Sequence, residues 1–200
     1  GREGVQVICP SKKGIAGVGS LNFTLQERLN PQDGKKAELK RGQALTLRQG
    51  DKVMQTKNNY SAEWVEERAG TDFFGMGIYN GDIGVIKSID DELTVSYGTK
   101  DVIYQKGELD ELELAYAITV HKSQGSEFPV VVMPILSQHF VMLRRNLIYT
   151  GMTRAKKLLI IVGSRKAMEM AIEKAKGKYP FKYTFISVFV FAIISLSVIA

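Results

Sequence analysis

The hydrophobic pattern changes character twice along the chain, and this change limits the possible folds more than any other feature. Outside the altered region, continuous apolar runs such as 5–9 and 130–136 are typical of buried parallel strands. Inside it, short apolar runs alternate with turn signals, as in a small antiparallel barrel. The sequence therefore predicts an α/β unit, residues 1–44 and 107–176, interrupted by a β-barrel at residues 45–106.

The period of the apolar residues places the expected helices. Leu21, Leu25 and Leu29 recur at every fourth position and stop before Pro31, which indicates a helix with an apolar stripe. Three further helices are expected, at residues 121–124, 143–153 and 164–176.

Strands are expected where a short apolar run is bounded by glycine, asparagine or aspartate. In the α/β unit they are expected at residues 5–9, 114–119, 130–136 and 157–162. In the barrel they are expected at residues 45–47, 51–57, 83–89, 93–97 and 102–104. The polar residues 32–43 are expected to form a linker. Residues 61–77, with a run of acids and the only tryptophan, are expected to form a long loop inside the barrel.

Composition excludes several classes of protein. With 44% hydrophobic and 24% charged residues, the chain is not a disordered, fibrous or polytopic membrane protein. One cysteine excludes an internal disulfide, and two histidines leave little material for a metal cluster, so we expect no metal site. The net charge of +6 is concentrated in residues 144–178, which carry ten Lys/Arg and two Glu. Such a segment suits a polyanion, or it is a solvated helix face.

The two ends of the sequence are unusual in composition. The chain starts without methionine and enters a strand-like run almost at once, which predicts a fragment whose upstream part is missing. Residues 183–200 carry no charge and follow three lysines, so they suit a membrane anchor, a buried terminal element or an accidental extension. The abrupt change after residue 177 favours the accidental extension. We therefore treat residues 177–200 as a hydrophobic tail of uncertain nature, and expect a cytoplasmic protein without a membrane partner.

Two polar clusters contain the residues best suited to chemistry. The first, residues 119–128, combines His121 and Lys122 with a glycine at the edge of the expected sheet, which suits contact with a phosphate or nucleotide. The second, residues 144–157, places Arg154 between a helix and a strand, where a guanidinium can stabilise charge on a transferred phosphoryl group. Taken alone, each cluster also has an ordinary explanation, as a connecting loop and as cations at a helix C-terminus.

Together and in this order, the two clusters resemble motifs V and VI of superfamily 1 DNA helicases. More narrowly, they resemble the RecD-like branch, the exodeoxyribonuclease V alpha-subunit type. The segments that carry this resemblance are 115–127 for motif V, 146–154 for motif VI, 5–31 for the motif IV region, and 50–55, 58–60 and 79–84 for an inserted SH3-like barrel. The resemblance covers about residues 4–170. It implies a RecA-like second motor domain of the P-loop NTPase helicase type, with the barrel inserted in it.

The resemblance also implies roles for individual residues. Arg154 corresponds to an arginine finger on the γ-phosphate of ATP and is the expected catalytic residue. Other contacts with ATP are implied for Lys12, Lys13, Gly125 and Glu127, the last of these with the ribose. Contacts with single-stranded DNA are implied for Thr119, His121, Lys122 and Gln124.

The sequence departs from the family pattern because it has neither a G-x-x-x-x-G-K-[ST] loop nor an acidic pair for Mg²⁺. The resemblance therefore implies the C-terminal motor half of an ATP-dependent DNA helicase, of the kind used in DNA repair and recombination. It implies 5′-to-3′ movement on single-stranded DNA and duplex unwinding. ATP and Mg²⁺ would be held mainly by an N-terminal RecA-like domain that is a partner outside this sequence. Alone, the fragment is expected to be inactive as an ATPase. The sequence leaves open whether the whole protein works alone or as a subunit of a nuclease complex.

Two other functions remain open at this point. The chain could be a non-catalytic module that binds single-stranded nucleic acid through the barrel and the basic segment. The bases of the bound strand would then stack on the aromatic side chains Phe73, Phe74, Tyr79 and Tyr97. We expect these aromatics to form the barrel core instead. The other alternative, a membrane-tethered protein, depends only on the hydrophobic tail.

Overall fold

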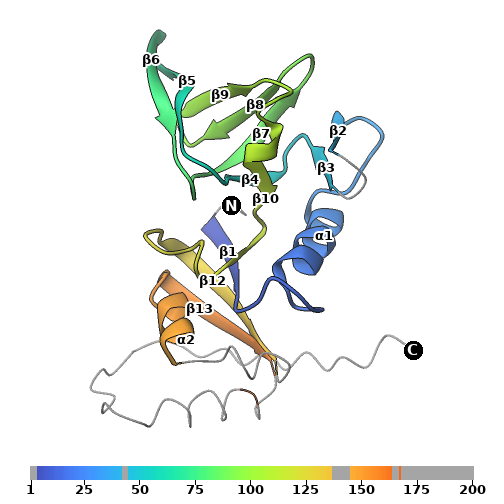
Figure 1. Cartoon of the computed structure of the whole chain (residues 1–200), viewed down its shortest axis with the longest axis vertical. Helices are drawn as coiled ribbons and strands as arrows, with labels where there is room; N and C mark the ends of the chain where they lie inside the picture. Colours follow the sequence, from blue (N-terminus) through green and yellow to red (C-terminus); the bar gives the residue numbers. More distant parts are fainter. Residues whose placement is uncertain (1–3, 42–44, 137–144, 164–166, 168–200) are drawn as a thin grey trace. The chain divides into compact units, whose positions relative to one another are not determined.

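The computed structural model describes residues 4–41, 45–136, 145–163 and 167 (Figure 1). The contacts divide the chain into two compact units, residues 1–21 with 117–200 and residues 22–116. The domain limits expected near residues 44 and 107 stay a prediction. The expected helix at 164–176, apart from residue 167, and the hydrophobic tail lie outside the described residues.

The first unit is built on a parallel sheet of four strands in the order β11-β1-β12-β13. These strands are β1 (Val5–Cys9), β11 (Ala117–Thr119), β12 (Phe128–Ile135) and β13 (Ala155–Gly163). Figure 1 labels three of these strands, β1, β12 and β13. Strand β1 pairs with both β11 and β12, so the expectation that 5–9 and 130–136 share one sheet is confirmed. Strands β1 and β12 are rich in β-branched residues. Their side chains Ile8, Val131 and Ile135 are buried, as in a sheet covered on its faces.

Helix α2 (Arg145–Met152) precedes β13 in the chain. It approaches the sheet closely at Gly151, which has no side chain to separate the two. A Cβ atom built on Gly151 would lie 2.7 Å from Cε of Met133 on β12 and 3.6 Å from Cγ2 of Val120. A larger residue at position 151 would therefore push the helix away from β12. The expected helix at 143–153 is confirmed over its described part.

Two expectations for this region are wrong. Residues 114–119 are not one strand, because the chain leaves one sheet at Leu114 and enters another at Ala117. Between the two strands, the backbone N–H of Ala115 donates to the carbonyl of Lys52, which ends the first pairing. Residues 121–124 form consecutive turns rather than a helix, with hydrogen bonds that span three or four residues.

The second unit contains an antiparallel sheet of seven strands in the order β10-β4-β7-β8-β9-β5-β6. Its strands are β4 (Lys52–Gln55), β5 (Asn59–Arg68), β6 (Thr71–Ile78), β7 (Ile83–Ile89), β8 (Leu93–Tyr97), β9 (Lys100–Tyr104) and β10 (Leu112–Leu114), the last preceded by the short 3₁₀ helix η2 (Leu109–Glu111). The bounds expected for β7 and β8 are confirmed, and β4 and β9 differ from expectation only at their ends.

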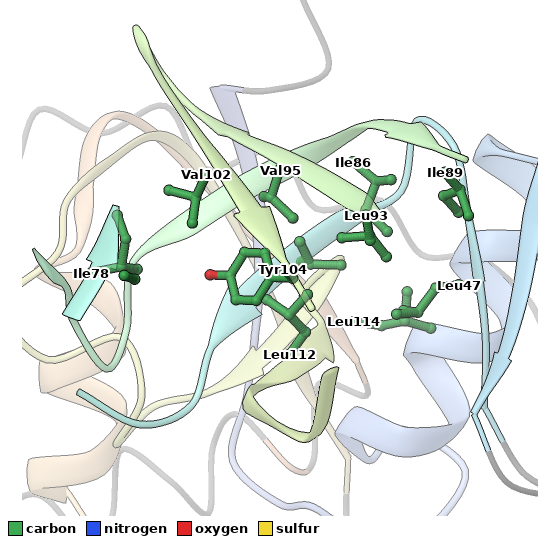
Figure 2. Packing of buried hydrophobic residues seen from close by; sticks show 12 residues of the cluster. Leu47, Ile78, Ile86, Ile89, Leu93, Val95, Val102, Tyr104, Leu112 and Leu114 are labelled. Carbon is green, nitrogen blue, oxygen red and sulfur yellow. The ribbon is translucent and has the colours of Figure 1, made fainter. Parts of the chain in front are cut away.

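The core of this unit is formed by apolar side chains from most of its strands (Figure 2). Tyr104 lies among them, and its hydroxyl donates to Oε1 of Gln55 at 2.8 Å. Burial raises the pKa of Tyr104 to about 12, so the phenol stays protonated and keeps this donor at neutral pH. The fully buried aliphatic members include Leu47, Val53, Ile86, Leu93, Val95, Val102 and Leu112.

The expectation of a long loop at residues 61–77 is wrong. These residues form most of the hairpin of β5 and β6, whose two strands are joined at Ala69 and Gly70 with φ angles of 51° and 77°. Glycine adopts such left-handed angles easily, so the turn is sharp. The run of acids hid the strand, because Glu66 lies on the same side as Ala62 and Trp64 and breaks the apolar alternation.

The expectation of a linker at residues 32–43 is also wrong in part. Residues 38–41 form β2 (Glu38–Arg41), which pairs antiparallel with β3 (Leu45–Arg48) in a separate two-stranded ribbon. The Arg48 guanidinium closes the base of this ribbon, with Nε 2.6 Å from Glu38 and Nη2 2.7 Å from Glu27. The 45–47 strand is therefore confirmed as a strand but does not belong to the seven-stranded sheet.

Helix α1 (Val18–Leu29) is confirmed where the leucine stripe predicted it, but its buried residues are polar. Asn22 and Gln26 are buried along the helix, and Asn30 continues their row just after it. Leu29, by contrast, is exposed and Leu21 and Leu25 are half-buried. In place of apolar packing, these amides form hydrogen bonds within the second unit, which we call the barrel unit. Asn22, for example, donates to the carbonyl of Leu114 on β10 at 2.9 Å.

The centre of these polar contacts is the buried carboxylate of Asp51, just before β4. One oxygen accepts from Asn30 Nδ2 at 2.7 Å and from the Tyr116 hydroxyl at 2.9 Å. The other accepts from Gln26 Nε2 at 2.5 Å and from the backbone N–H of Arg48 at 2.8 Å. We call these five residues the Asp51 cluster. It ties the end of α1, the start of β4 and the segment after β10 to one side chain.

No helix in the part of the chain that the structure describes is both long and apolar enough to cross a membrane.

Candidate functional site

The residues singled out from the sequence lie at the two opposite ends of the strands of the parallel sheet. We call the end that Thr119 reaches the first edge and the end at which Phe128 begins β12 the second edge. At the carboxyl ends of β1 and β11, Cys9 pairs in register with Thr119. At the amino ends of β12 and β13, Phe128 pairs with Ala155. All four strands run in the same direction. The loops that follow Cys9 and Thr119 therefore lie at the first edge, and the segments that lead into Phe128 and Ala155 lie at the second edge. The connection 120–127 runs from one edge to the other.

The first edge carries a turn of polar residues after β11. Its base is fixed by two buried hydroxyls: Thr119 Oγ1 accepts from the backbone N–H of Lys122 at 3.2 Å, and Ser123 Oγ donates to the carbonyl of Val120 at 2.8 Å. The side chains of His121 and Gln124 are exposed. The turn therefore presents polar side chains outward from a fixed backbone, which suits a ligand that passes along the edge of the sheet.

Lys12 and Lys13 lie at this same edge, in the loop that follows β1. The backbone N–H of Val120 donates to the carbonyl of Cys9 at 3.2 Å, so the two loops start side by side. Gly17 allows the loop to fold back tightly, because a Cβ atom there would lie 2.6 Å from the backbone of Lys12 and Lys13. The structure thus places these two lysines with the turn of His121.

Arg154 lies at the second edge, where its guanidinium joins α2 to the end of the 120–127 connection. Nε donates to the carbonyl of Thr150 at 3.2 Å, Nη1 to the carbonyl of Ser126 at 3.3 Å, and Nη2 to Oγ1 of Thr153 at 3.2 Å. The backbone carbonyl of Arg154 accepts from the N–H of Phe128 at 2.8 Å. Within the described residues, these bonds use three of the five guanidinium N–H groups. One N–H on each terminal nitrogen is left for an oxygen ligand.

Glu127 and Gly125 complete this edge. The Glu127 carboxylate is exposed and lies 3.0 Å from Nζ of Lys156, an exposed pair that contributes little to stability. Gly125 has φ = +83°, a left-handed angle that lets the connection bend toward β12. The structure therefore places Arg154 next to the segment of Glu127, because Nη1 of Arg154 donates to the carbonyl of Ser126. It does not bring Lys12 or Lys13 to this edge.

Cys9 lies next to the first edge but is unsuited to chemistry. Its side chain is buried, and burial raises the pKa of the thiol to about 12. The thiolate is the nucleophilic form, so the neutral thiol of Cys9 acts only as a small apolar side chain in the sheet. Among the described residues, there is no group of three or more His, Cys, Asp or Glu that could hold a metal ion.

The sequence did not predict the roles of two serines in the cluster 119–128. The Ser123 hydroxyl stabilises the turn by donating to the carbonyl of Val120, and the carbonyl of Ser126 accepts from the Arg154 guanidinium. Only Ser123 had a usable signal, since a serine in a tight turn commonly bonds to nearby backbone. The role of Ser126 is played by its backbone, which no side-chain pattern reveals.

Comparison with known proteins gives two matches to family models. The model described as UvrD-like helicase C-terminal domain matches residues 114–162. The model described as ATP-dependent RecD-like DNA helicase SH3 domain matches residues 21–97. The two matches confirm the expected fold class, a RecA-like α/β domain combined with an SH3-like barrel.

Curated relatives are similar over most of this chain. The ATP-dependent RecD2 DNA helicase of Deinococcus radiodurans is 37% identical over 177 residues, which are 88% of this chain and 22% of the relative. The RecBCD enzyme subunit RecD of Mycolicibacterium smegmatis is 30% identical over 169 residues, 84% of this chain and 27% of the relative. The chain thus spans about a quarter of the length of these relatives. Among solved structures, the Pif1 helicase from Candida albicans matches 84% of this chain and 49% of its own, with 17% identity and a TM-score of 0.49.

Proposed function

Because the chain is similar to RecD-like superfamily 1 DNA helicases over both of its compact units, we propose that it is the C-terminal motor half of an ATP-dependent DNA helicase. In this proposal the whole protein couples ATP hydrolysis to movement on single-stranded DNA, 5′-to-3′, and to unwinding of the duplex. Its partners are the strand itself and an N-terminal motor domain beyond this sequence, which supplies the P-loop and the ligands of Mg²⁺.

The observation that carries the proposal is the contact between Arg154 and the carbonyl of Ser126. It joins the motif VI arginine to the motif V segment at one sheet edge, beside Glu127. A guanidinium held there, with N–H groups left for oxygens, can bind two oxygens of a phosphoryl group at once. It would stabilise the negative charge that develops as the γ-phosphoryl group is transferred.

The opposite edge is proposed to hold the DNA. His121, Lys122 and Gln124 belong to a turn whose base is fixed by buried Thr119 and Ser123, so Thr119 would act through this turn. Lys12 and Lys13, for which the sequence suggested ATP, lie beside this turn, and their position supports a contact with the strand instead. The 120–127 connection then links the DNA edge to the nucleotide edge within one stretch of backbone.

A first prediction separates the two edges by mutation. In the full-length helicase, His121→Ala and Lys122→Ala should leave basal ATP turnover intact, because neither side chain lies at the Arg154 edge. Stimulation by DNA should fall about tenfold or more, since part of the strand contact is lost. The measurement is steady-state ATP hydrolysis with and without saturating single strand, and Lys57→Ala, an exposed lysine of the barrel unit, is the matched control. Loss of basal turnover in Lys122→Ala would place this turn at the nucleotide.

A second prediction concerns the isolated chain. It should bind single-stranded DNA weakly, with an affinity that falls as salt rises, because lysine and arginine contacts release counterions from phosphates. Each phosphate neutralised adds about −0.7 to the slope of log affinity against log salt. Fluorescence anisotropy of a labelled oligonucleotide at several salt concentrations gives the slope. A Lys12→Ala, Lys13→Ala double variant should reduce its magnitude by about 1.4. An unchanged slope would remove both lysines from the DNA edge.

A further inference from the structure

The hairpin of β5 and β6 exposes apolar side chains that the fold and the proposed function leave unused. Phe74 is 78% exposed and Met76 is 61% exposed, contrary to the expectation that the aromatics of this region form the barrel core. Phe73 and Tyr79 are exposed as well, whereas Tyr97 is half-buried and its hydroxyl lies 2.7 Å from that of Tyr104. Exposed apolar side chains gathered on one element usually mark an interaction surface.

The register of the hairpin shows which residues share a face. Phe74 pairs with Val65 and Met76 pairs with Glu63, so all four lie on the same side of the two strands. The Asp72 and Glu67 pair also belongs to this side. We call the six residues the hairpin face: Glu63, Val65, Glu67, Asp72, Phe74 and Met76.

The other side of the hairpin is partly covered by the protein itself, although Phe73 on that side is 48% exposed with Arg68 over its ring. Trp64 lies flat over Gly75, where a Cβ atom would be 2.2 Å from the indole ring. The ammonium group of Lys100 lies 4.1 Å from the centre of the same ring, a cation–π contact. The hairpin face is therefore the more exposed side, with Phe74 and Met76 available to a partner.

Strand β6 also offers its backbone. It is the last strand of the seven-stranded sheet, and within the described residues it pairs only with β5. Its eight residues, Thr71–Ile78, contain neither the lysine nor the proline that commonly protects an exposed edge strand. An edge strand of this kind can accept an extended peptide as a further strand, through main-chain hydrogen bonds.

The charge of the hairpin selects the chemistry of the partner. The two strands carry four carboxylates and one arginine, and that arginine is already bound, with Arg68 Nη2 2.7 Å from Glu66. The hairpin face itself carries three carboxylates and no cation. Such a surface repels the phosphates of nucleic acid and attracts lysine or arginine. Base stacking on Phe74 would bring phosphates close to these acids.

We propose that the β6 edge binds an extended segment of a partner protein that presents cations and apolar side chains together on one face. The segment adds as a strand beside β6, with its apolar groups over Phe74 and Met76 and its cations near Glu67 and Asp72. This role is separate from the ATP and DNA contacts proposed above, which belong to the other compact unit.

The test uses the whole 200-residue chain and a labelled peptide, Lys-Thr-Val-Thr-Lys-Thr-Val-Thr-Lys, whose lysines and valines share one face when extended. Fluorescence anisotropy should show saturable binding. Phe74→Ser and Met76→Ser should each weaken it about tenfold or more, as for an interface residue of moderate importance. Phe23→Ser is the matched control, because Phe23 is 66% exposed on helix α1 and lies outside the seven-stranded sheet. It should leave binding unchanged.

Two altered peptides test the chemistry. Glutamate in place of lysine should abolish binding through repulsion by the carboxylates. N-methylation of alternate threonine amides, which removes the donors toward β6, should also abolish it. Equal binding of either peptide would overturn the proposal, as would unchanged binding by Phe74→Ser. Should Phe74→Ser fail to fold, as judged by circular dichroism, Met76→Ser decides the question alone.

Two further outcomes would assign the face to another occupant. If Met76→Ser weakened binding of a single-stranded oligonucleotide and not of the peptide, the face would belong to nucleic acid. If the chain dimerised in analytical ultracentrifugation and Met76→Ser made it monomeric, the occupant would be a second copy. Either result overturns the proposal of a basic partner segment. Neither bears on Arg154, so the proposed helicase function stands or falls separately.

Discussion

Replacing Arg154 with alanine should reduce ATP turnover of the full-length protein by roughly 10³-fold or more, while affinity for single-stranded DNA stays within a few-fold. An arginine finger acts on charge that develops only in the transition state, and such groups contribute about 10³ to 10⁵ in related phosphoryl transfers. Arg154 lies at the edge opposite His121, so its loss should leave the strand contact intact. Steady-state ATP hydrolysis and a DNA titration on the same preparation measure both quantities.

Arg154→Lys should restore little of this activity, because an ammonium group is a point charge without the planar fork that spans two oxygens. Its three donors also lie on a single nitrogen, so they do not reproduce the fixed spacing of Nε and Nη1, which contact Thr150 and Ser126. The matched control is Lys156→Ala, which removes an exposed cation two residues away and should change turnover little. If Arg154→Ala spared turnover and only weakened DNA binding, Arg154 would be a phosphate-backbone contact and not a finger.

Changing Asp51 to asparagine should lower the free energy of unfolding of the barrel unit by about 2–4 kcal/mol, although the two side chains have nearly the same shape. Each carboxylate oxygen of Asp51 accepts two hydrogen bonds. An amide NH₂ in either position would therefore face two donors and leave them without an acceptor. Urea unfolding followed by the fluorescence of Trp64, the only tryptophan, reports on this unit directly.

The control for this prediction is Asp91→Asn, which makes the same change at an exposed carboxylate in the turn between β7 and β8. It should shift the unfolding free energy by less than about 0.5 kcal/mol. Tyr116→Phe removes only one of the four donors and should cost about 1 kcal/mol. If Asp51→Asn were as stable as the original chain, the carboxylate would not be needed as a fourfold acceptor and the cluster would be held by packing alone.

The sequence could predict those elements whose apolar residues follow a simple period. Strands β1, β7 and β8 have the bounds that their alternating or continuous apolar residues indicated. The hairpin of β5 and β6 could not be found in this way, because its inner row includes buried Glu66, paired with Arg68, and its outer row includes exposed Phe74. The apolar period fails here because a buried position holds a carboxylate and an exposed position holds an aromatic ring.

The sequence could predict which loops hold the candidate site residues, but not which of these loops lie together. Motif spacing placed Arg154, Glu127 and His121 in loops beside the sheet, where the structure has them. Which edge of the sheet each loop occupies depends on strand order, and the pairing of β1 between β11 and β12 joins residues more than a hundred positions apart. The resemblance to the motif IV region assigned Lys12 and Lys13 to ATP together with Arg154, whereas the structure places their loop beside the turn of His121. The Asp51 cluster was beyond prediction because its partners come from separate segments of the chain.

The buried amides of α1 determine how the barrel could be cut out or exchanged between related proteins. A cut at residues 44 and 107 would remove Asp51 and leave Gln26 and Asn30 behind without the acceptors to which their amides donate. Each stranded amide would cost about 1–3 kcal/mol if it stayed buried. A transplantable cassette would therefore have to include the helix from Asn22 onward and end after Tyr116. Inheritance of the barrel is thereby tied to inheritance of its neighbouring helix.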